Sequence, residues 1–285
     1  MDRPHAPRTR TIGPYQLITR LDPPGTPVPC HRFVARAPGG DRTVVAVTPV
    51  QGADPARFAA EADAARRLMG PWVAPVVDLA PPGTAPWYAH PYLPALPLPT
   101  ALAVHGGPLP ERTVRALGAA LAETLAGAHA QGVVHAGLSP AAVLLAPDGP
   151  RLGCFGAART GTPGLDPGAL PPERGADGAA AEPGDVYALG AVLAYAATGH
   201  TVPERSELPE GLRPLLASCL TRDPAARPTA AALLGALAPP SPHATVVSTA
   251  APLLAPGWLP GRVVAAVARQ SAAVLAAELP DPVRN

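Results

Sequence analysis

Lysine is absent from this chain. All 22 basic residues are arginines, and the only asparagine among the 285 residues is the terminal Asn285. A codon bias toward Ala, Gly, Pro and Arg accounts for most of this. Whatever its origin, the absence excludes any mechanism that needs a lysine as a nucleophile or as a phosphate ligand.

Charged and aromatic residues are also scarce. Charged residues make up 15% of the chain and aromatic residues 4%, and the net charge is +1. Because a nucleic acid or an anionic membrane is normally bound by a basic surface, neither is expected as a partner. The 42 prolines accompany 47% hydrophobic residues, which indicates a globular chain with many turns, as one two-lobed domain or two small domains.

The three cysteines, Cys30, Cys154 and Cys219, are far apart and odd in number. This pattern suggests neither a disulfide framework nor a zinc site, and it favours a reducing, cytoplasmic compartment. The arginine-rich beginning of the chain is not followed by an apolar run, so a signal peptide is not expected. No uncharged apolar stretch of about 18 residues free of proline occurs, so a membrane span is not expected either.

The first part of the chain is predicted to be rich in strands. Alternating hydrophobicity predicts five of them, at residues 15–21, 31–36, 43–47, 73–79 and 86–93. One helix is predicted at 55–69, because Asp54 is a good N-cap and a proline follows it. Its apolar residues, from Phe58 to Met69, recur at helical spacing, and Glu61 lies in its interior.

The second part is predicted to be mainly helical. Helices are expected at 110–129, at 185–198 with Asp185 as the cap, and around 209–220, 228–237 and 260–279. The expected organisation is a flexible basic tail (1–11), a β-rich lobe (12–93), a helical lobe (94–238), a proline-rich linker (239–257) and a C-terminal helix (258–285).

Residues 133–145, with the sequence VVHAGLSPAAVLL, are predicted to form a strand, a tight loop and a second strand. A loop held in this way is a good platform for catalytic side chains. Here, however, almost every loop position that could carry out chemistry is Ala, Gly or Ser.

Five motifs, in order along the chain, give a resemblance to eukaryotic-type Ser/Thr protein kinases, and most of all to those of actinobacteria. HAGLSPAAVLL matches the pattern H-R-D-L-K-P-x-N-V-L-L, CFG (154–156) matches D-F-G, and PPE (171–173) matches A-P-E. DVYALG (185–190) matches the start of a large-lobe helix, and CLTRDPAARPT (219–229) matches C-x-x-x-D-P-x-x-R-P-T. The resemblance covers about residues 12–238 and implies a bilobal α+β fold.

The resemblance also implies where catalytic groups should be, and most are replaced. The resemblance places the lysine of the third strand at Thr48 and the helix glutamate that pairs with this lysine at Glu61. In the loop, Gly137 occupies the position of the general base, Ser139 that of a second lysine, and Ala142 that of the Mg²⁺-binding asparagine. The aspartate of D-F-G falls on Cys154, and a thiol is a poor ligand for Mg²⁺. No metal or other cofactor is therefore expected.

The positions that are architectural in the family are retained. The resemblance implies that His135 and Phe155 stack, that Asp185 anchors the loop, and that Glu173 pairs with Arg227; Gly156 is retained beside them. It also places an adenine slot at Ala46, Ala89, Tyr92 and Leu144. Without a lysine or a glycine-rich loop, such a slot would bind a nucleotide weakly and without metal.

Several alternatives stay open at this point. Glu61 is a solvated carboxylate or has a new partner, for which Arg32, Arg36 and Arg66 are candidates. Cys154 is a small buried filler, a redox sensor or a soft metal ligand. Asp148 and Asp166 are candidate replacement metal ligands, Thr160 and Thr162 candidate phosphorylation sites, and the helix at 260–279 packs on its own large lobe or binds a partner.

Two functions are compatible with these residues. The first is a catalytically inactive kinase-like domain, a pseudokinase, which binds an active kinase, a substrate of one, or a regulator. The second is a divergent ATP-binding phosphotransferase with relocated catalytic groups. Nucleotide titration separates the two, because only the second requires Mg·ATP.

Overall fold

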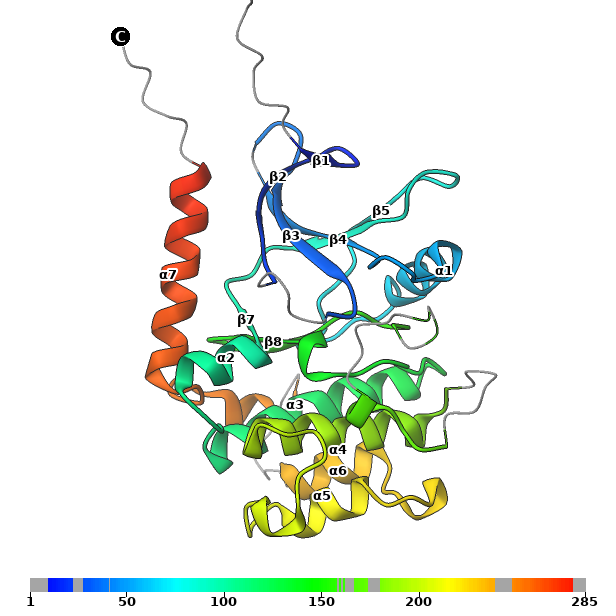
Figure 1. Ribbon diagram of the computed structural model, residues 1–285, viewed down its shortest axis with the longest axis vertical. Helices are drawn as coiled ribbons and strands as arrows, with labels where there is room; N and C mark the ends of the chain where they lie inside the picture. The colour runs from blue at the N-terminus through cyan, green and yellow to red at the C-terminus, as the bar shows by residue number, and fades with distance from the viewer. Residues whose placement is uncertain are drawn as a thin grey trace, which may run out of the picture.

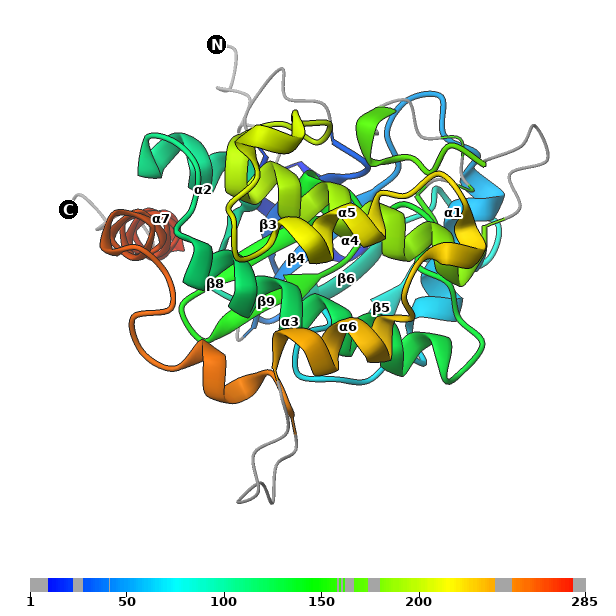
Figure 2. The same cartoon turned by 90° about the horizontal axis from the view of Figure 1, so that it is seen from below.

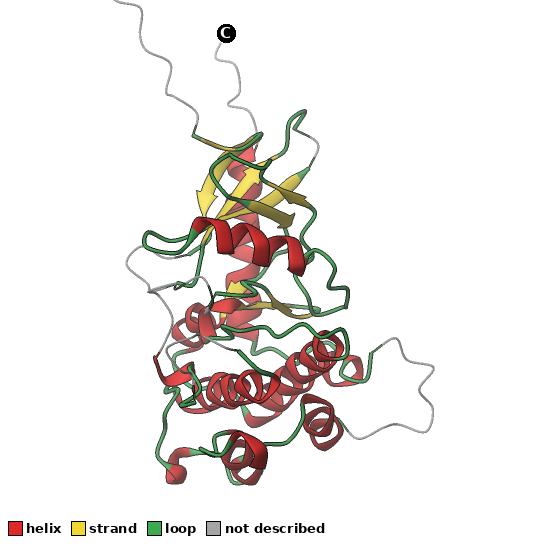
Figure 3. Cartoon of the chain, turned by 90° about the vertical axis from the view of Figure 1, so that its right-hand side faces the viewer, coloured by secondary structure: helices red, strands yellow, loops and turns green. Residues whose placement is uncertain are grey.

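A computed structural model describes residues 10–22, 28–40, 42–157, 159, 161, 167–173, 180–238 and 248–278. A small lobe of strands with one helix lies above a larger, mainly helical lobe (Figures 1 and 3). The expected bilobal α+β fold is therefore confirmed. The expected basic tail lies almost wholly outside the described residues, as do Thr160, Thr162, Asp166 and the first half of the expected linker.

The small lobe is built on a six-stranded sheet with the order β1-β2-β3-β4-β6-β5, in which all neighbours are antiparallel. Its strands are β1 (Thr11–Ile12), β2 (Tyr15–Arg20), β3 (His31–Arg36), β4 (Thr43–Thr48), β5 (Asp78–Leu79) and β6 (Tyr88–Pro91). The last two are shorter than predicted. Prolines at 75, 81, 82 and 86 remove backbone N–H donors around them, which limits pairing.

Helix α1 (Pro55–Ala65) packs beneath the sheet. The Asp54 carboxylate accepts hydrogen bonds from the backbone N–H of Ala56 and of Arg57, at 2.9 and 3.1 Å, so the predicted cap is present. Phe58 and Ala62 are buried on its inner face. The helix ends earlier than predicted, and Met69, expected on the apolar face, is 81% exposed.

The large lobe is arranged around α3 (Glu111–His129). Its other helices are α2 (Leu98–His105), α4 (Glu182–Thr198), α5 (Arg213–Cys219) and α6 (Ala230–Leu237). Figure 2 shows α4 and α6 beside α3. A Cβ atom at Gly118 of α3 would lie 3.0 Å from Leu193 and Leu237, so the absence of a side chain there allows the three helices to pack closely.

A second sheet, with the order β7-β8-β9, lies between the lobes. It contains β7 (Leu96–Pro97), β8 (Val143–Ala146) and β9 (Gly149–Leu152). Only the second strand predicted within 133–145 is therefore present. Residues 133–139 are irregular: the backbone N–H groups of His135 and Ala136 donate to the Asp185 carboxylate and that of Val133 to the carbonyl of Ala128, rather than to a neighbouring strand.

Helix α7 (Gly261–Glu278) stands along one side of the molecule (Figure 1). It contacts α2 and β7, and also β2 of the small lobe. Val263, Val267 and Val274 are buried, whereas Leu275, expected on the same stripe, is 61% exposed. Packing on the large lobe alone is thus an incomplete description, because α7 touches both lobes. No helix in the described part of the chain is long and apolar enough to cross a membrane.

Candidate functional site

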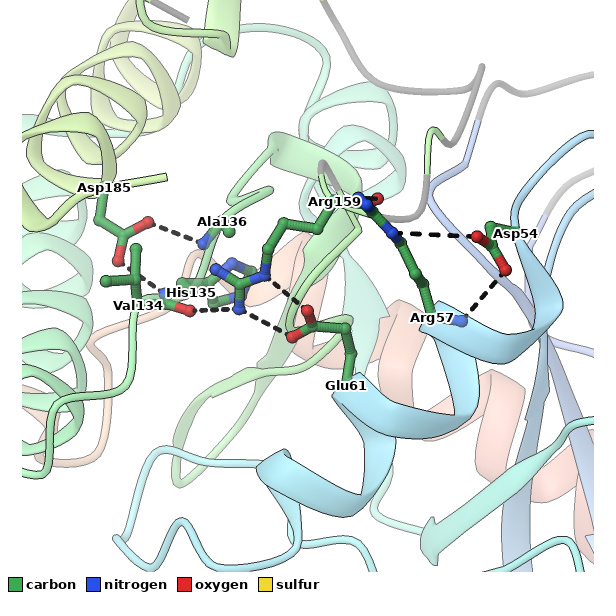
Figure 4. Close-up of polar contacts among 8 residues, drawn as sticks. All are labelled: Asp54, Arg57, Glu61, Val134, His135, Ala136, Arg159 and Asp185. Atoms are coloured by element: carbon green, nitrogen blue, oxygen red, sulfur yellow. Dashed lines mark hydrogen bonds and ion pairs between the residues drawn. The ribbon is translucent and has the colours of Figure 1, made fainter. Parts of the chain in front are cut away.

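The loop at 133–139 is anchored from below by Asp185. One carboxylate oxygen of Asp185 accepts from the backbone N–H of His135 at 2.7 Å, and the other from that of Ala136 at 2.9 Å (Figure 4). His129 donates from Nε2 to the same carboxylate at 2.9 Å. Asp185 lies within the first turn of α4 and does not cap it, since Ala181 is the N-cap. Its carboxylate is thereby available to the loop.

His135 is a packed structural side chain. Its ring lies 4.3 Å from the ring of Phe155, as the resemblance implies, and its Nε2 donates to the carbonyl of Gly153 at 3.0 Å. Burial lowers the pKa of His135, so the ring is neutral at pH 7. A neutral ring whose N–H is already donated fills space and fixes the neighbouring backbone.

Glu61 of α1 pairs with Arg159. The guanidinium Nε and Nη2 lie 2.5 and 2.7 Å from the two carboxylate oxygens, and Nη2 also donates to the carbonyl of Val134 at 3.1 Å (Figure 4). Arg57 donates to the carbonyl of Arg159 at 3.0 Å. The expected partners were wrong: Glu61 is held by an arginine 98 residues away, beyond the CFG motif.

Gly156 is required by this ion pair. Its φ is +76°, and an added Cβ would collide with the side chain of Glu61. A side chain here would therefore meet both backbone strain and a clash with the carboxylate that Arg159 holds.

The strand that should carry the family's lysine presents a different face from the one predicted. Val45 and Val47 of β4 belong to the core shared with α1, whereas Ala46 lies in a separate cluster with Tyr15 and Trp87 on the other side of the sheet. Because side chains alternate along a strand, Thr48 also points away from α1. The side chains of this strand that share a core with α1 are thus Val45 and Val47, whereas Ala46 and Thr48, which the resemblance assigned to the adenine slot and to the lysine, lie on the other face.

The predicted adenine slot is only partly assembled. Ala89 pairs with Ala46 and lies with it on the outer face, so neither lines the space between the lobes. Leu144 is buried in the core between the lobes. Tyr92 packs against that core, and its hydroxyl is buried without a hydrogen-bond partner.

Cys30 and Cys154 form a disulfide, with Cα atoms 6.6 Å apart. The prediction of unpaired cysteines was therefore wrong for this pair, because the fold brings together positions that are 124 residues apart. Sequence alone could have suggested it: Cys154 replaces the D-F-G aspartate, and Cys30 ends the segment that matches the phosphate-covering loop. Cys219 is free and buried.

A buried ion pair joins Asp22 to Arg32. The Nε of Arg32 lies 3.0 Å from Oδ1 of Asp22, and the backbone N–H of Arg32 donates to Oδ2 at 3.1 Å. Arg32 is paired in register with Val47, so it shares the inner face of the sheet. Asp22 follows directly after Leu21, near the start of the segment where the family has its glycine-rich loop.

The residues present do not fit Mg·ATP. Gly137 and Ala142 are buried and offer no side-chain oxygen, and Cys154 is bonded to Cys30. Ser139 has a buried hydroxyl without a hydrogen-bond partner, and Asp148 pairs with Arg151 at 2.7 Å. Across the described ranges no group of three or more His, Cys, Asp or Glu side chains is placed to hold a metal ion.

Glu173 and Arg227 form the ion pair that the resemblance implies. The two guanidinium–carboxylate distances are 2.6 and 2.7 Å, and these hydrogen bonds lower the pKa of Glu173. Arg227 also donates to the carbonyl of Pro183, at the beginning of α4. The segment around Glu173 is thereby fixed to the large lobe.

Comparison with known proteins places this architecture in a family, although no family model matches the chain. The chain is 38% identical, over 79% of its length, to the probable serine/threonine-protein kinase PkwA of Thermomonospora curvata. It is 34% identical, over 90% of its length, to the serine/threonine-protein kinase AfsK of Streptomyces coelicolor. It spans about a third of the length of these relatives, 34% and 35% respectively.

A solved structure shows the same fold. The kinase domain of Mycobacterium tuberculosis PknI superposes with a TM-score of 0.65 at 23% identity, covering 80% of this chain and 96% of that one. The bilobal fold agrees with this similarity. The chain belongs to the eukaryotic-type Ser/Thr protein kinase family.

Proposed function

We propose that this chain is a catalytically inactive kinase-like domain, a pseudokinase, which acts as a binding, scaffolding or regulatory module in signalling. One observation carries the proposal: groups that handle charge during phosphoryl transfer are missing from several separate segments. The resemblance places Thr48, Gly137, Ala142 and Cys154 where a kinase needs a lysine, a general base and two metal ligands, and none of the four can supply that chemistry. No lysine exists elsewhere to compensate.

The retained contacts support a role for the scaffold itself. Asp185 holds the loop and Arg227 holds Glu173, so the parts that shape the large lobe are intact. The Glu61–Arg159 pair links α1 to the segment just beyond the CFG motif. A movement of α1 would therefore displace the segment beyond CFG, and the reverse. Such coupling suits a module that signals by changing the surface it presents to a partner.

The proposed partner is a protein: an active kinase, a substrate of one, or a regulator. The names of the relatives support this class, since a protein kinase acts on proteins. The near-neutral net charge of +1 argues against nucleic acid. We also propose a cytoplasmic location, the expectation drawn from the sequence, and no bound cofactor, with weak metal-independent nucleotide binding as the most that the remaining slot would allow.

The alternative is a divergent phosphotransferase with relocated groups. One observation favours it: Asp22 and Arg32 place a carboxylate and a guanidinium on the inner face of the sheet, beside Val47. Both are buried and bonded to each other, so neither is free for a nucleotide in this conformation. For this reason the inactive domain is the preferred proposal.

A nucleotide titration tests the two functions. Thermal unfolding is followed with and without millimolar Mg·ATP, for reduced and for oxidised protein, because the Cys30–Cys154 bond joins the lobes. The pseudokinase predicts at most a small rise in stability that does not depend on Mg²⁺, whereas a ligand at 100 times its Kd would raise the free energy of unfolding by about 2.7 kcal/mol. Transfer of γ-labelled phosphate to protein, lost in an Arg32→Met variant, would establish the alternative. An active kinase of the family serves as the positive control.

A further inference from the structure

The disulfide between Cys30 and Cys154 joins the two lobes covalently. Cys30 directly precedes β3 of the small lobe, and Cys154 follows β9, 124 residues later. Their Cα atoms are 6.6 Å apart, within the range that a disulfide bridges. Both side chains are buried in the core shared by the sheet, α1 and the large lobe. The bond therefore lies between the lobes rather than at the edge of one of them.

The backbone holds Cys154 in place for this contact. Its φ is +58°, in the left-handed region that residues with side chains rarely adopt. The carbonyl of Cys154 accepts a hydrogen bond from the backbone N–H of Ala157 at 3.3 Å, and the backbone N–H of Gly156 donates to the carbonyl of His135 at 2.7 Å. Strained backbone that the surroundings stabilise is typical of functional positions. Backbone hydrogen bonds at Cys154 and two residues beyond it therefore fix the backbone in this conformation.

Cys219 provides a contrast within the same chain. It lies on α5, is fully buried, and has no disulfide partner. Burial raises its pKa to about 12, so it stays a thiol at neutral pH. Because Cys219 has no disulfide partner, its alkylation can be followed separately from that of Cys30 and Cys154.

We propose that Cys30 and Cys154 form a reversible redox latch. The disulfide holds the small lobe against the large lobe, and its reduction lets the lobes separate. Arg159, five residues beyond Cys154, holds Glu61 of α1, so the covalent bond acts next to an ionic link between the same two parts of the fold. The latch does not depend on the proposed function, because it would act in an active or an inactive kinase fold.

The oxidant is a hydroperoxide, and the reaction takes two steps. One thiolate attacks the peroxide, the O–O bond breaks, and the sulfur is oxidised to a sulfenic acid while water or an alcohol leaves. The second thiol loses its proton and attacks the sulfenic sulfur, so that the S–S bond forms and a second water leaves. A dithiol reverses the bond by thiol–disulfide exchange and is itself oxidised to a disulfide.

Peptide mapping tests whether the bond forms. Because the chain lacks lysine, trypsin cuts only after arginine and places the cysteines in peptides 21–32, 152–159 and 206–222. The full chain is treated with hydrogen peroxide and alkylated without reductant. Peptide 21–32 should then be joined to 152–159, with only 206–222 alkylated. If dithiothreitol is added after the peroxide and before the alkylation, all three peptides should be alkylated.

Hydrogen exchange and thermal unfolding test whether the bond acts as a latch. Reduction should speed backbone exchange in residues 28–36 and 55–65 and lower the Tm by about 5–15 °C. The Cys219→Ser variant should respond in the same way as the wild type. The Cys30→Ser and Cys154→Ser variants should have the Tm of the reduced protein and should not respond to dithiothreitol.

Two outcomes would overturn the proposal. Three alkylated cysteines after peroxide treatment would exclude the bond, and a cross-link whose reduction changes neither exchange nor Tm would exclude the latch. The comparison of wild-type protein with and without dithiothreitol needs no variant, and Cys30→Ala is available if Cys30→Ser does not fold. Neither outcome concerns ATP binding or turnover, so neither would decide whether the domain is catalytically inactive.

Discussion

Arg159 and Glu61 form a two-point ion pair between the segment beyond CFG and helix α1, with N–O distances of 2.5 and 2.7 Å. Both side chains are partly buried, at 26% and 17% exposure, so solvent screens the pair only in part. The pairing gives the helix glutamate a partner in place of the lysine that this family usually supplies.

The ion pair should make a measurable contribution to stability. A double-mutant cycle of Glu61→Gln and Arg159→Gln, followed by urea denaturation, should give a coupling free energy of about 1–2 kcal/mol. Asp54 and Arg57 offer the control, since their exposed pair at 3.9 Å should couple by less than about 0.5 kcal/mol. A coupling of the same small size for both pairs would contradict the inference.

Removing the Asp185 carboxylate should destabilise the loop at 133–139. Asp185→Ala leaves the buried N–H groups of His135 and Ala136 without an acceptor, and Ala136 keeps a φ of +52° that nothing then supports. The free energy of unfolding should fall by about 3–5 kcal/mol. Asp148→Ala, at an exposed turn, should change it by less than about 1 kcal/mol; equal effects would show that Asp185 is not the anchor.

Gly156→Ala should cost more than Gly161→Ala. Both glycines have positive φ, +76° and +70°, but only at Gly156 would the new Cβ collide with another side chain, that of Glu61. Urea denaturation should show that the free energy of unfolding falls by about 2–5 kcal/mol for Gly156→Ala and by about 1–2 kcal/mol for Gly161→Ala. The difference should shrink when Glu61 is also replaced by Ala. If it does not, the collision is not its cause.

His90 should make stability fall with pH below neutrality. Burial lowers its pKa to about 4, against about 6.5 in the unfolded chain. Between these values the unfolded chain binds a proton that the folded chain does not, so the stabilisation is complete above pH 6.5 and is lost as pH falls toward 4. Lowering the pH from 6.5 to 4 should therefore reduce the free energy of unfolding of the wild type by about 3 kcal/mol through this group. His90→Gln should have a correspondingly flatter pH dependence in urea denaturation; parallel profiles would contradict the assignment.

The sequence motifs were informative wherever the contact is local or the family residue is retained. Asp54 capped its helix as expected, and the motif positions of Asp185 and Arg227 led to their partners because the large lobe keeps its usual residues. Helix α2 was missed. It is short and no side chain caps its beginning; Pro99 in its first turn and Gly106 at its end are the local signals that could have marked it.

The errors have a common physical origin in long-range packing. A shift of one residue exchanges the two faces of a strand, which is why Thr48 and Ala46 were assigned to the side that Val47 and Val45 occupy. The partners of Glu61 and of Cys154 lie 98 and 124 residues away. No periodicity reports which distant side chains a fold will bring together.

Helix α7 determines where the molecule can bend. It touches α2 of the large lobe and β2 of the small lobe along one side, while α1 lies on the opposite side of the small lobe (Figure 1). When the Cys30–Cys154 bond is reduced and both contacts of α7 are kept, the small lobe would rotate about an axis near that helix. The displacement is then greatest at the far side, so Glu61 would travel further than any residue of β2.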